Sequence, residues 1–251
     1  MKFEEKIKNK YLYRKGNNIF KLFYFLYQYF KSRKILKQKV FYSNWGIDMM
    51  ADEFFKKKSK GFYIDVGCHQ PIINNNTYRL YRRGWSGINI DLDFNTIDMF
   101  DFFRKNDLNI EAGVSNSVEE KELYFFHNRS AVNTLSKESG SKAKEVRKIK
   151  TTTLNKIIEN SRYKDSEIDY ISIDVEGHEL SVLEGLDFKK YKPKLVVLEL
   201  IDPSIKEFYE QKLENIINSE INKFMEKENY KLINWIHDDL VYVPKETVIS
   251  I

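Results

Sequence analysis

Acidic side chains end four of the five short apolar segments in the central part of the chain. The four are Asp65, Asp91, Asp174 and Glu199. Short apolar runs bounded by turns are typical of buried strands, and in an open parallel sheet ligands bind beyond the carboxyl ends of the strands. A single carboxylate at such a place often only caps the next helix. Four of them at one sheet edge predict a site whose carboxylates accept hydrogen bonds from hydroxyl groups, attract a cation or take up a proton.

The first two acids indicate a nucleoside ligand without phosphate. Asp91, at the end of the second segment, is placed to accept hydrogen bonds from both hydroxyls of a ribose. The first turn reads Gly67-Cys68-His69-Gln70-Pro71 and lacks the G-x-G-x-x-G spacing that lets a pyrophosphate approach a helix. Asp65, just before the turn, would repel such a phosphate. A cofactor with a ribose, a base and a cation fits these residues, and S-adenosylmethionine has that chemistry.

The elements that would carry these residues alternate along the sequence. Strand-like segments cover 61–67, 88–91, 109–115, 168–174 and 195–200, and helix-like segments cover 77–83, 95–104 and 179–186. Apolar strands that alternate with helices predict an α/β fold in which helices cover both faces of a parallel sheet.

A longer region separates the third and fourth strands. Segments 122–126 and 148–152 are strand-like, whereas 128–144 is polar and rich in turn residues. Long loops inside compact domains are often functional. We therefore expect contacts with the acceptor substrate from this loop and from the amino-terminal arm.

The carboxyl-terminal region predicts a helix followed by a hairpin. Asp202-Pro203 has the residue types of a helix start, and apolar positions recur at helical spacing as far as Met225. The segments 230–236 and 240–243 predict a closing antiparallel hairpin.

Charge and cysteine content exclude several classes of protein. Residues 1–60 carry a net charge of +11, whereas residues 61–251 carry −6. Binding of nucleic acid requires a basic groove beside the chemistry, so the acidic body argues against a nucleic-acid partner. A single cysteine, Cys68, excludes a disulfide framework or a thiolate zinc cluster and favours a cytoplasmic setting.

The basic arm contains the most apolar stretch of the chain, Ile19–Phe30. As a helix its 12 residues would rise about 18 Å, short of the ~30 Å hydrocarbon core of a bilayer. A basic run over 31–39 follows, and this order is typical of a helix that lies on a membrane surface. The alternative is a helix that packs on the body or on a second subunit. Residues 11–40 thus predict peripheral association with the inner face of the membrane or a homo-oligomer contact, and Trp45–Phe55 predicts a second amphipathic helix.

Two blocks of sequence resemble the FkbM-type methyltransferase domain over residues 61–200. The first block is GFYIDVGCHQP with NNTYRLYRRGWSGINID, and the second is VRKIKTTTLNKII with DYISIDVEGHELSVLEGLDFKKYKPKLVVLE. The shared elements are Asp-Val-Gly, Asn-Thr before the first helix, the Gly84-Trp85-x-Gly87 turn, Thr-Thr-Leu, and Asp-Val-Glu-Gly-x-Glu. The first turn departs from the usual Gly-Ala-Asn-x-Gly because the second glycine is absent.

The resemblance implies a class I methyltransferase fold, a Rossmann-like α/β domain. Its seven-stranded sheet has a reversed last strand, and here it would occupy residues 61–251 after a helical arm in residues 1–60. The cofactor would be S-adenosylmethionine. The positions that match its binding residues are Asp65, Gly67, Cys68, His69, Asp91, Ser115 and Asp174.

The activity that the resemblance implies is O-methylation, with a sugar hydroxyl of a glycan or polysaccharide precursor as the expected target. The alternatives are an inactive methyltransferase-like module that binds a glycan or a partner and, less favoured, a nucleic-acid methyltransferase. The candidate catalytic residues are Asp174, Glu176 and His178, with His178 as general base and Glu176 or Glu179 orienting it.

Other candidates compete for parts of this chemistry. His69 is the alternative general base. Asp174, Glu176 and Glu199 form an alternative set of oxygen ligands for Mg²⁺. His127 and His237 are expected to be surface or structural residues.

Overall fold

The computed structural model describes residues 22–23, 25–27, 30, 40–127, 130–200 and 210–248. The chain divides into two compact units, Met1–Val40 and Phe41–Ile251. Residues 41–60, which the sequence analysis grouped with the arm, are therefore part of the second unit.

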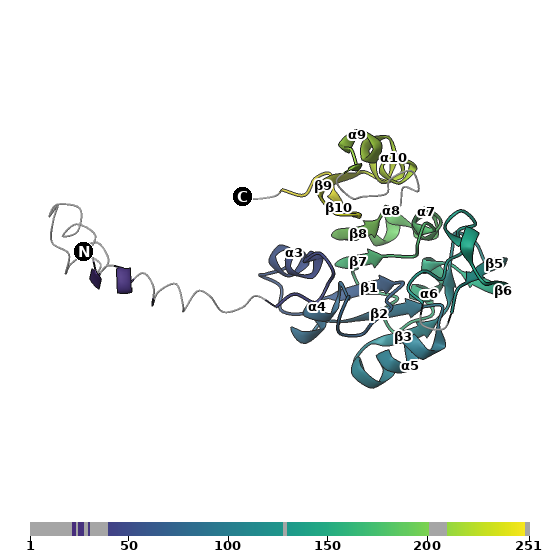
Figure 1. Ribbon diagram of the computed structural model, residues 1–251, viewed down its shortest axis with the longest axis horizontal. Helices are drawn as coiled ribbons and strands as arrows, with labels where there is room; N and C mark the ends of the chain where they lie inside the picture. The colour runs from purple at the N-terminus through teal and green to yellow at the C-terminus, as the bar shows by residue number, and fades with distance from the viewer. Residues whose placement is uncertain are drawn as a thin grey trace. The chain divides into compact units, whose positions relative to one another are not determined.

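A mostly parallel seven-stranded sheet runs through the second unit in the order β3-β2-β1-β7-β8-β10-β9 (Figure 1). Neighbouring strands are parallel from β3 to β8, whereas β10 is antiparallel to both β8 and β9. The strands are β1 (Phe62–Val66), β2 (Ser86–Asp91), β3 (Leu108–Glu111), β7 (Tyr170–Ile173), β8 (Leu195–Glu199), β9 (Tyr230–Ile236) and β10 (Asp239–Pro244). The predicted parallel sheet with a reversed last strand is confirmed.

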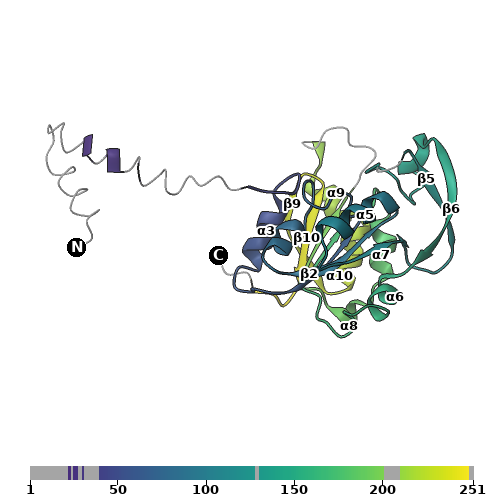
Figure 2. The ribbon, with the colours of Figure 1, turned by 90° about the horizontal axis from the view of Figure 1, so that it is seen from below.

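Helices cover both faces of this sheet, as predicted. Alternate residues of β1 point to opposite faces, so Ile64 belongs to one buried cluster and Tyr63 to the other. Figure 2 sets α3 on one side of the strands and α6 and α7 on the other. The helices are α3 (Ile47–Phe54), α4 (Tyr78–Arg82), α5 (Phe94–Phe103), α6 (Leu154–Glu159), α7 (Glu179–Glu184), α8 (Phe188–Tyr191), α9 (Leu213–Asn218) and α10 (Glu220–Lys227).

The expected third strand, 109–115, is two strands in the structure. β3 ends at Glu111, and β4 (Gly113–Val114) leaves the large sheet to pair with β6 (Glu145–Thr152). β6 also pairs antiparallel with β5 (Glu120–Phe125), which completes a small three-stranded sheet. The apolar run continues through Ala112, so the sequence pattern carries no sign of this change of partner.

The prediction of a single long helix from 202 to 225 is wrong for the residues that the structure describes. Residues 201–209, including the expected start, lie outside the described residues. Beyond them the chain forms α9 and α10, which are separated at Ser219. The backbone of Ser219 is extended, and its hydroxyl accepts a hydrogen bond from the Asn222 N–H at 3.1 Å. An N-cap therefore divides a helix whose apolar spacing is continuous.

Most of the amino-terminal arm lies outside the described residues. Within the predicted helix Ile19–Phe30, residues 22–23, 25–27 and 30 are described and helical, and the basic run 31–39 is not described. In the described parts of the chain, no helix is both long and apolar enough to cross a bilayer. The second predicted helix is confirmed as α3, whose Ile47 and Ala51 are buried.

A buried guanidinium joins α5 to the strands and to the first turn. Arg104 is fully buried and donates hydrogen bonds to Asp107 at 2.9 Å, to the Tyr63 hydroxyl at 2.6 Å and to the Pro71 carbonyl at 3.0 Å. It also donates to the Thr77 hydroxyl at 3.0 Å. These partners come from four separate segments, so one side chain fixes their relative positions. The sequence pattern indicated Arg104 only as the end of a helix.

We expect Arg104→Ala to lower the free energy of unfolding by about 3–5 kcal/mol, because it leaves the Asp107 carboxylate buried without its cationic partner. Urea denaturation measures this change. The control is Lys148→Ala, which removes an exposed ion pair with Glu120 and should leave the free energy of unfolding nearly unchanged. Equal stabilities of the two variants would contradict the importance of the buried contacts.

Candidate active site

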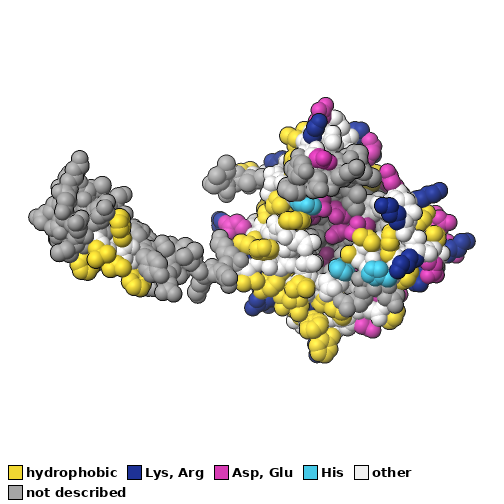
Figure 3. Space-filling view, viewed as in Figure 1, with side chains coloured by type: hydrophobic (Ala, Val, Ile, Leu, Met, Phe, Trp, Pro, Cys, Tyr) yellow, Lys and Arg dark blue, Asp and Glu magenta, His cyan; other side chains and the backbone are white. Residues whose placement is uncertain are grey.

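A cavity of about 210 Å³ opens at the carboxyl edge of the parallel strands. It is far larger than the ~15 Å³ that a single water molecule occupies, so it has room for a small-molecule ligand. Its walls come from the ends of β1, β2, β7 and β8 and from the loop 130–135. Figure 3 shows acidic side chains gathered in a hollow on this face of the molecule. Part of the predicted loop 128–144 thus lines the cavity; residues 128–129 lie outside the described residues.

The turn after β1 is built for close approach of three strands. Gly67 has φ +77°, and a Cβ there would lie 1.7 Å from the Asp174 carbonyl oxygen, so no other residue fits. The N–H groups of Gly67 and Cys68 both donate to the Ile90 carbonyl, at 2.9 and 3.2 Å. The turn is therefore fixed between β2 and β7 and forms the floor of the cavity.

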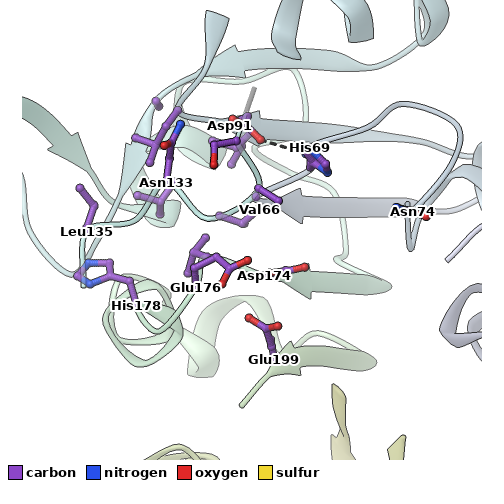
Figure 4. A pocket seen from close by; sticks show the side chains of 18 of the residues that line it. Val66, His69, Asn74, Asp91, Asn133, Leu135, Asp174, Glu176, His178 and Glu199 are labelled. Atoms are coloured by element: carbon purple, nitrogen blue, oxygen red, sulfur yellow. Dashed lines mark hydrogen bonds between the residues drawn. The ribbon is translucent and has the colours of Figure 1, made fainter. Parts of the chain in front are cut away.

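Asp91 is held at the cavity by backbone N–H groups. One carboxylate oxygen accepts from His69 at 3.0 Å and the other from Asp93 at 2.9 Å (Figure 4). Each oxygen keeps a further lone pair, and both residues of the His69–Asp91 pair line the cavity. Burial raises the pKa of Asp91. This arrangement suits a ligand that presents two neighbouring hydroxyls.

Three of the expected cofactor-binding residues lie behind the cavity wall. The buried Asp65 carboxylate accepts hydrogen bonds from the Thr77 hydroxyl at 2.8 Å and from Asn75 at 3.0 Å, and burial raises its pKa to about 6. The Cys68 thiol is buried, and burial raises its pKa well above the usual range. Ser115 is also buried. The structure thus brings Gly67, His69, Asp91 and Asp174 to the cavity and places Asp65, Cys68 and Ser115 in its supporting layer.

A cluster of carboxyl groups lines the opposite side of the cavity. Asp174, Glu176 and Glu199 each offer an oxygen within 4.8 Å of the others (Figure 4). Burial, followed by repulsion between the carboxylates, raises the pKa of Glu176 to about 8 and raises the pKa values of Asp174 and Glu199 well above those of free carboxyl groups. No lysine or arginine in the described ranges lines the cavity. The cluster is therefore suited to hold protons or to receive a cation.

The turn that follows β7 presents Glu176 to the cavity. Glu176 has φ +59°, a left-handed conformation that is unfavourable for a side chain other than glycine. The buried Glu179 carboxylate stabilises this turn by accepting from the N–H groups of Val175 and Gly177, both at 3.0 Å. The Thr134 hydroxyl donates to the Glu176 carbonyl at 2.9 Å. Glu179 therefore supports the turn backbone instead of orienting His178.

His178 lines the cavity but is a weak proton acceptor. Its Nε2 lies 3.1 Å from the Ser115 hydroxyl. Burial and the positive charge of Lys121 lower its pKa to about 4. The imidazole is therefore neutral at pH 7, and its low pKa makes it a poorer base than the carboxyl groups across the cavity.

Several site residues could not be found from sequence patterns. Asn44, ahead of α3, and Asn133, in the loop, both line the cavity. Asp239 pairs in register with Glu199, and burial with the nearby Asp238 raises its pKa to about 8. These residues follow no recognisable motif, and only the fold brings them to the same edge.

The sheet order and the cavity at its carboxyl edge define a class I methyltransferase fold. The sequence matches the family described as "Methyltransferase FkbM domain" over residues 65–232, which is more than half of the chain. The protein therefore belongs to the FkbM methyltransferase family, as the sequence resemblance implied. No curated protein matches the sequence.

The raised carboxyl pKa values predict that the protein loses stability as the pH rises. Unfolded carboxyl groups titrate near pH 4, so between about pH 4 and pH 8 the folded state binds more protons than the unfolded state. Stability is then greatest at the acidic end of this window. We expect Glu199→Gln to raise the melting temperature at pH 8 and to change it much less at pH 5.

Thermal unfolding at the two pH values measures this effect, and each 1 kcal/mol regained corresponds to about 2–4 °C in a domain of this size. Glu138→Gln, at an exposed position, is the matched control. A Glu199→Gln melting temperature that shifts equally at both pH values would refute the proposed carboxylate repulsion.

Proposed function

We propose that the protein is an S-adenosylmethionine-dependent O-methyltransferase that acts on a sugar hydroxyl of a glycan or polysaccharide precursor. The observation that carries the proposal is one cavity with two chemically distinct sides. Asp91 on one side is arranged for a pair of hydroxyls, and on the other side three carboxyl groups with raised pKa values face the cavity, which no described lysine or arginine lines.

The donor set fits this cofactor. When bound, S-adenosylmethionine supplies an electrophilic methyl group on a sulfonium cation. Asp91 would hold the ribose hydroxyls, and the turn at Gly67–His69 lies beside it. Asp174 is open to the cavity and would attract the positive charge. The described lining offers a phosphate group no lysine or arginine, which supports an uncharged sugar acceptor over a nucleic acid.

Glu176 is the proposed general base, in place of His178. A base acts best when its pKa lies near the working pH, and the pKa of Glu176 is raised to about 8. Its left-handed backbone and the hydrogen bonds around it hold the carboxyl group at the cavity. Glu176 would accept the proton of the acceptor hydroxyl as that oxygen becomes a nucleophile. Asp174 and Glu199 also have raised pKa values, so they can share this proton with Glu176.

The proposed cofactor role predicts binding of S-adenosylhomocysteine, measured by isothermal titration calorimetry with the full-length protein. We expect a dissociation constant in the micromolar range or below. Asp91→Asn should weaken binding by about 10-fold or more, because it removes the charge from a hydrogen-bond acceptor.

The matched control is Asp98→Asn, at an exposed position of α5. Absence of binding by the unmodified protein would overturn the enzyme assignment and favour an inactive binding module. Unchanged affinity of Asp91→Asn would remove only the ribose role.

The proposed base predicts that Glu176→Gln lowers turnover by about 100-fold to 10,000-fold while S-adenosylhomocysteine still binds. Transfer of a labelled methyl group to nucleotide sugars and oligosaccharides measures turnover. For the unmodified protein the rate should rise with pH towards about pH 8, since Glu176 must lose its proton before it can accept another.

Two comparisons separate Glu176 from the other candidates. His178→Ala should keep most of the activity, and a loss as large as that of Glu176→Gln would return the base role to the histidine. Chelation with EDTA should leave the rate unchanged. Loss of activity that Mg²⁺ restores would instead assign Asp174, Glu176 and Glu199 as metal ligands.

A further inference from the structure

Trp45 and His237 form a stacked pair of rings within the second unit. Their centroids lie 4.2 Å apart with an angle of 13° between the planes. Trp45 precedes α3, whereas His237 occupies the turn between β9 and β10. The stack therefore joins segments that are almost 200 positions apart in the sequence, at the start and the end of the same unit.

This pair lies beside the acidic side of the cavity. Asn44, the residue before Trp45, lines the cavity. Asp239, two residues after His237, pairs in register with the cavity residue Glu199. The hairpin turn is also tied to the end of β8, because the Leu200 N–H donates to the Asp238 carbonyl at 2.8 Å. Both rings are thus attached to elements that form the cavity edge.

The stack leaves a large aromatic surface accessible. Trp45 is 50% exposed although His237 covers one side of its ring. His237 has φ +58°, a left-handed conformation that glycine adopts most readily and that histidine, asparagine and aspartate adopt more often than other residues. A single exposed apolar side chain is ordinary. An exposed indole that is oriented by a second ring on a tight turn at a cavity edge is a preformed flat surface.

The geometry points to a binding subsite for a pyranose ring of the acceptor. The Trp45 ring is the platform on which the sugar stacks, and His237 supports Trp45. The neighbouring carboxyl groups are the partners of the sugar hydroxyls. A pyranose has an apolar face of C–H groups and a rim of hydroxyls. A flat aromatic ring matches the face, and the carboxyl groups of Asp238 and Glu199 match the rim. The subsite rests on the proposed function, because it takes the sugar as the acceptor.

The carboxyl groups around Trp45 favour an uncharged sugar over the other ligands that stack on tryptophan. A nucleic-acid base also stacks on an indole, but it carries a phosphate, to which Asp238, Asp239 and Glu199 offer no positive charge. An anionic lipid headgroup would lack a cationic partner there for the same reason. An uncharged sugar ring uses both the aromatic surface and the acids.

The test is binding of simple saccharides to the full-length protein, with and without S-adenosylhomocysteine. Methyl glycosides of glucose, galactose, mannose and N-acetylglucosamine are the probes, and saturation-transfer NMR and calorimetric titration are the readouts. We expect at least one glycoside to bind and Trp45→Ala to weaken its binding by about 10-fold, as for other rings stacked on aromatic side chains.

Three further variants sharpen the test. Trp45→Phe should retain most of the affinity because it keeps a flat ring. His237→Asn removes the supporting ring while tolerating the left-handed turn, and it should cause an intermediate loss. Phe102→Ala removes an aromatic ring that is 67% exposed on α5, away from the cavity, and it should change nothing.

Failure of this inference is distinct from failure of the proposed function. The subsite is overturned if none of the four glycosides binds. It is also overturned if Trp45→Ala and the unmodified protein bind the glycoside with equal affinity. S-adenosylhomocysteine binding should be the same in Trp45→Ala and the unmodified protein. If the unmodified protein does not bind S-adenosylhomocysteine, the methyltransferase proposal is overturned, and the saccharide result is judged separately.

Discussion

The buried guanidinium of Arg104 is the constraint on which the geometry of the cavity depends. A charge in a protein interior is tolerated only when hydrogen bonds and opposite charge surround it. Arg104 meets this condition through Asp107, Tyr63, Thr77 and the Pro71 carbonyl, and the Tyr81 ring lies 4.4 Å from its centre. Because these partners belong to different segments, none of them can move without leaving the charge unsatisfied.

The effect of this constraint reaches the cavity through the first turn. Thr77 connects the guanidinium to Asp65, and Pro71 lies just after the turn that contains His69. The His69 N–H in turn holds Asp91. The residues behind the cavity wall therefore support the backbone that holds the Asp91 carboxylate at the cavity. Several positions that match the family's cofactor motif act in this indirect way here.

The sequence predicted the sheet and its acidic edge because both follow from local patterns. Apolar runs identify buried strands, and the residue after each run must stand at the sheet edge. The break at Ser219 and the separation of β3 from β4 were not predictable, because hydrophobic spacing does not register a change of partner or an N-cap within a helix. The position of Arg104 and the low pKa of His178 arise from tertiary burial, which a single sequence does not encode locally.

The reversed strand β10 has a consequence for how the edge of the cavity can change during evolution. Because β10 runs against its neighbours, the turn at His237 is placed on the same edge as Asp91 and Asp174. A short hairpin turn therefore completes an edge whose other side chains come from parallel strands far away in the sequence. Substitutions in that turn can change this part of the edge during evolution while the strands that carry Asp91 and Asp174 stay the same.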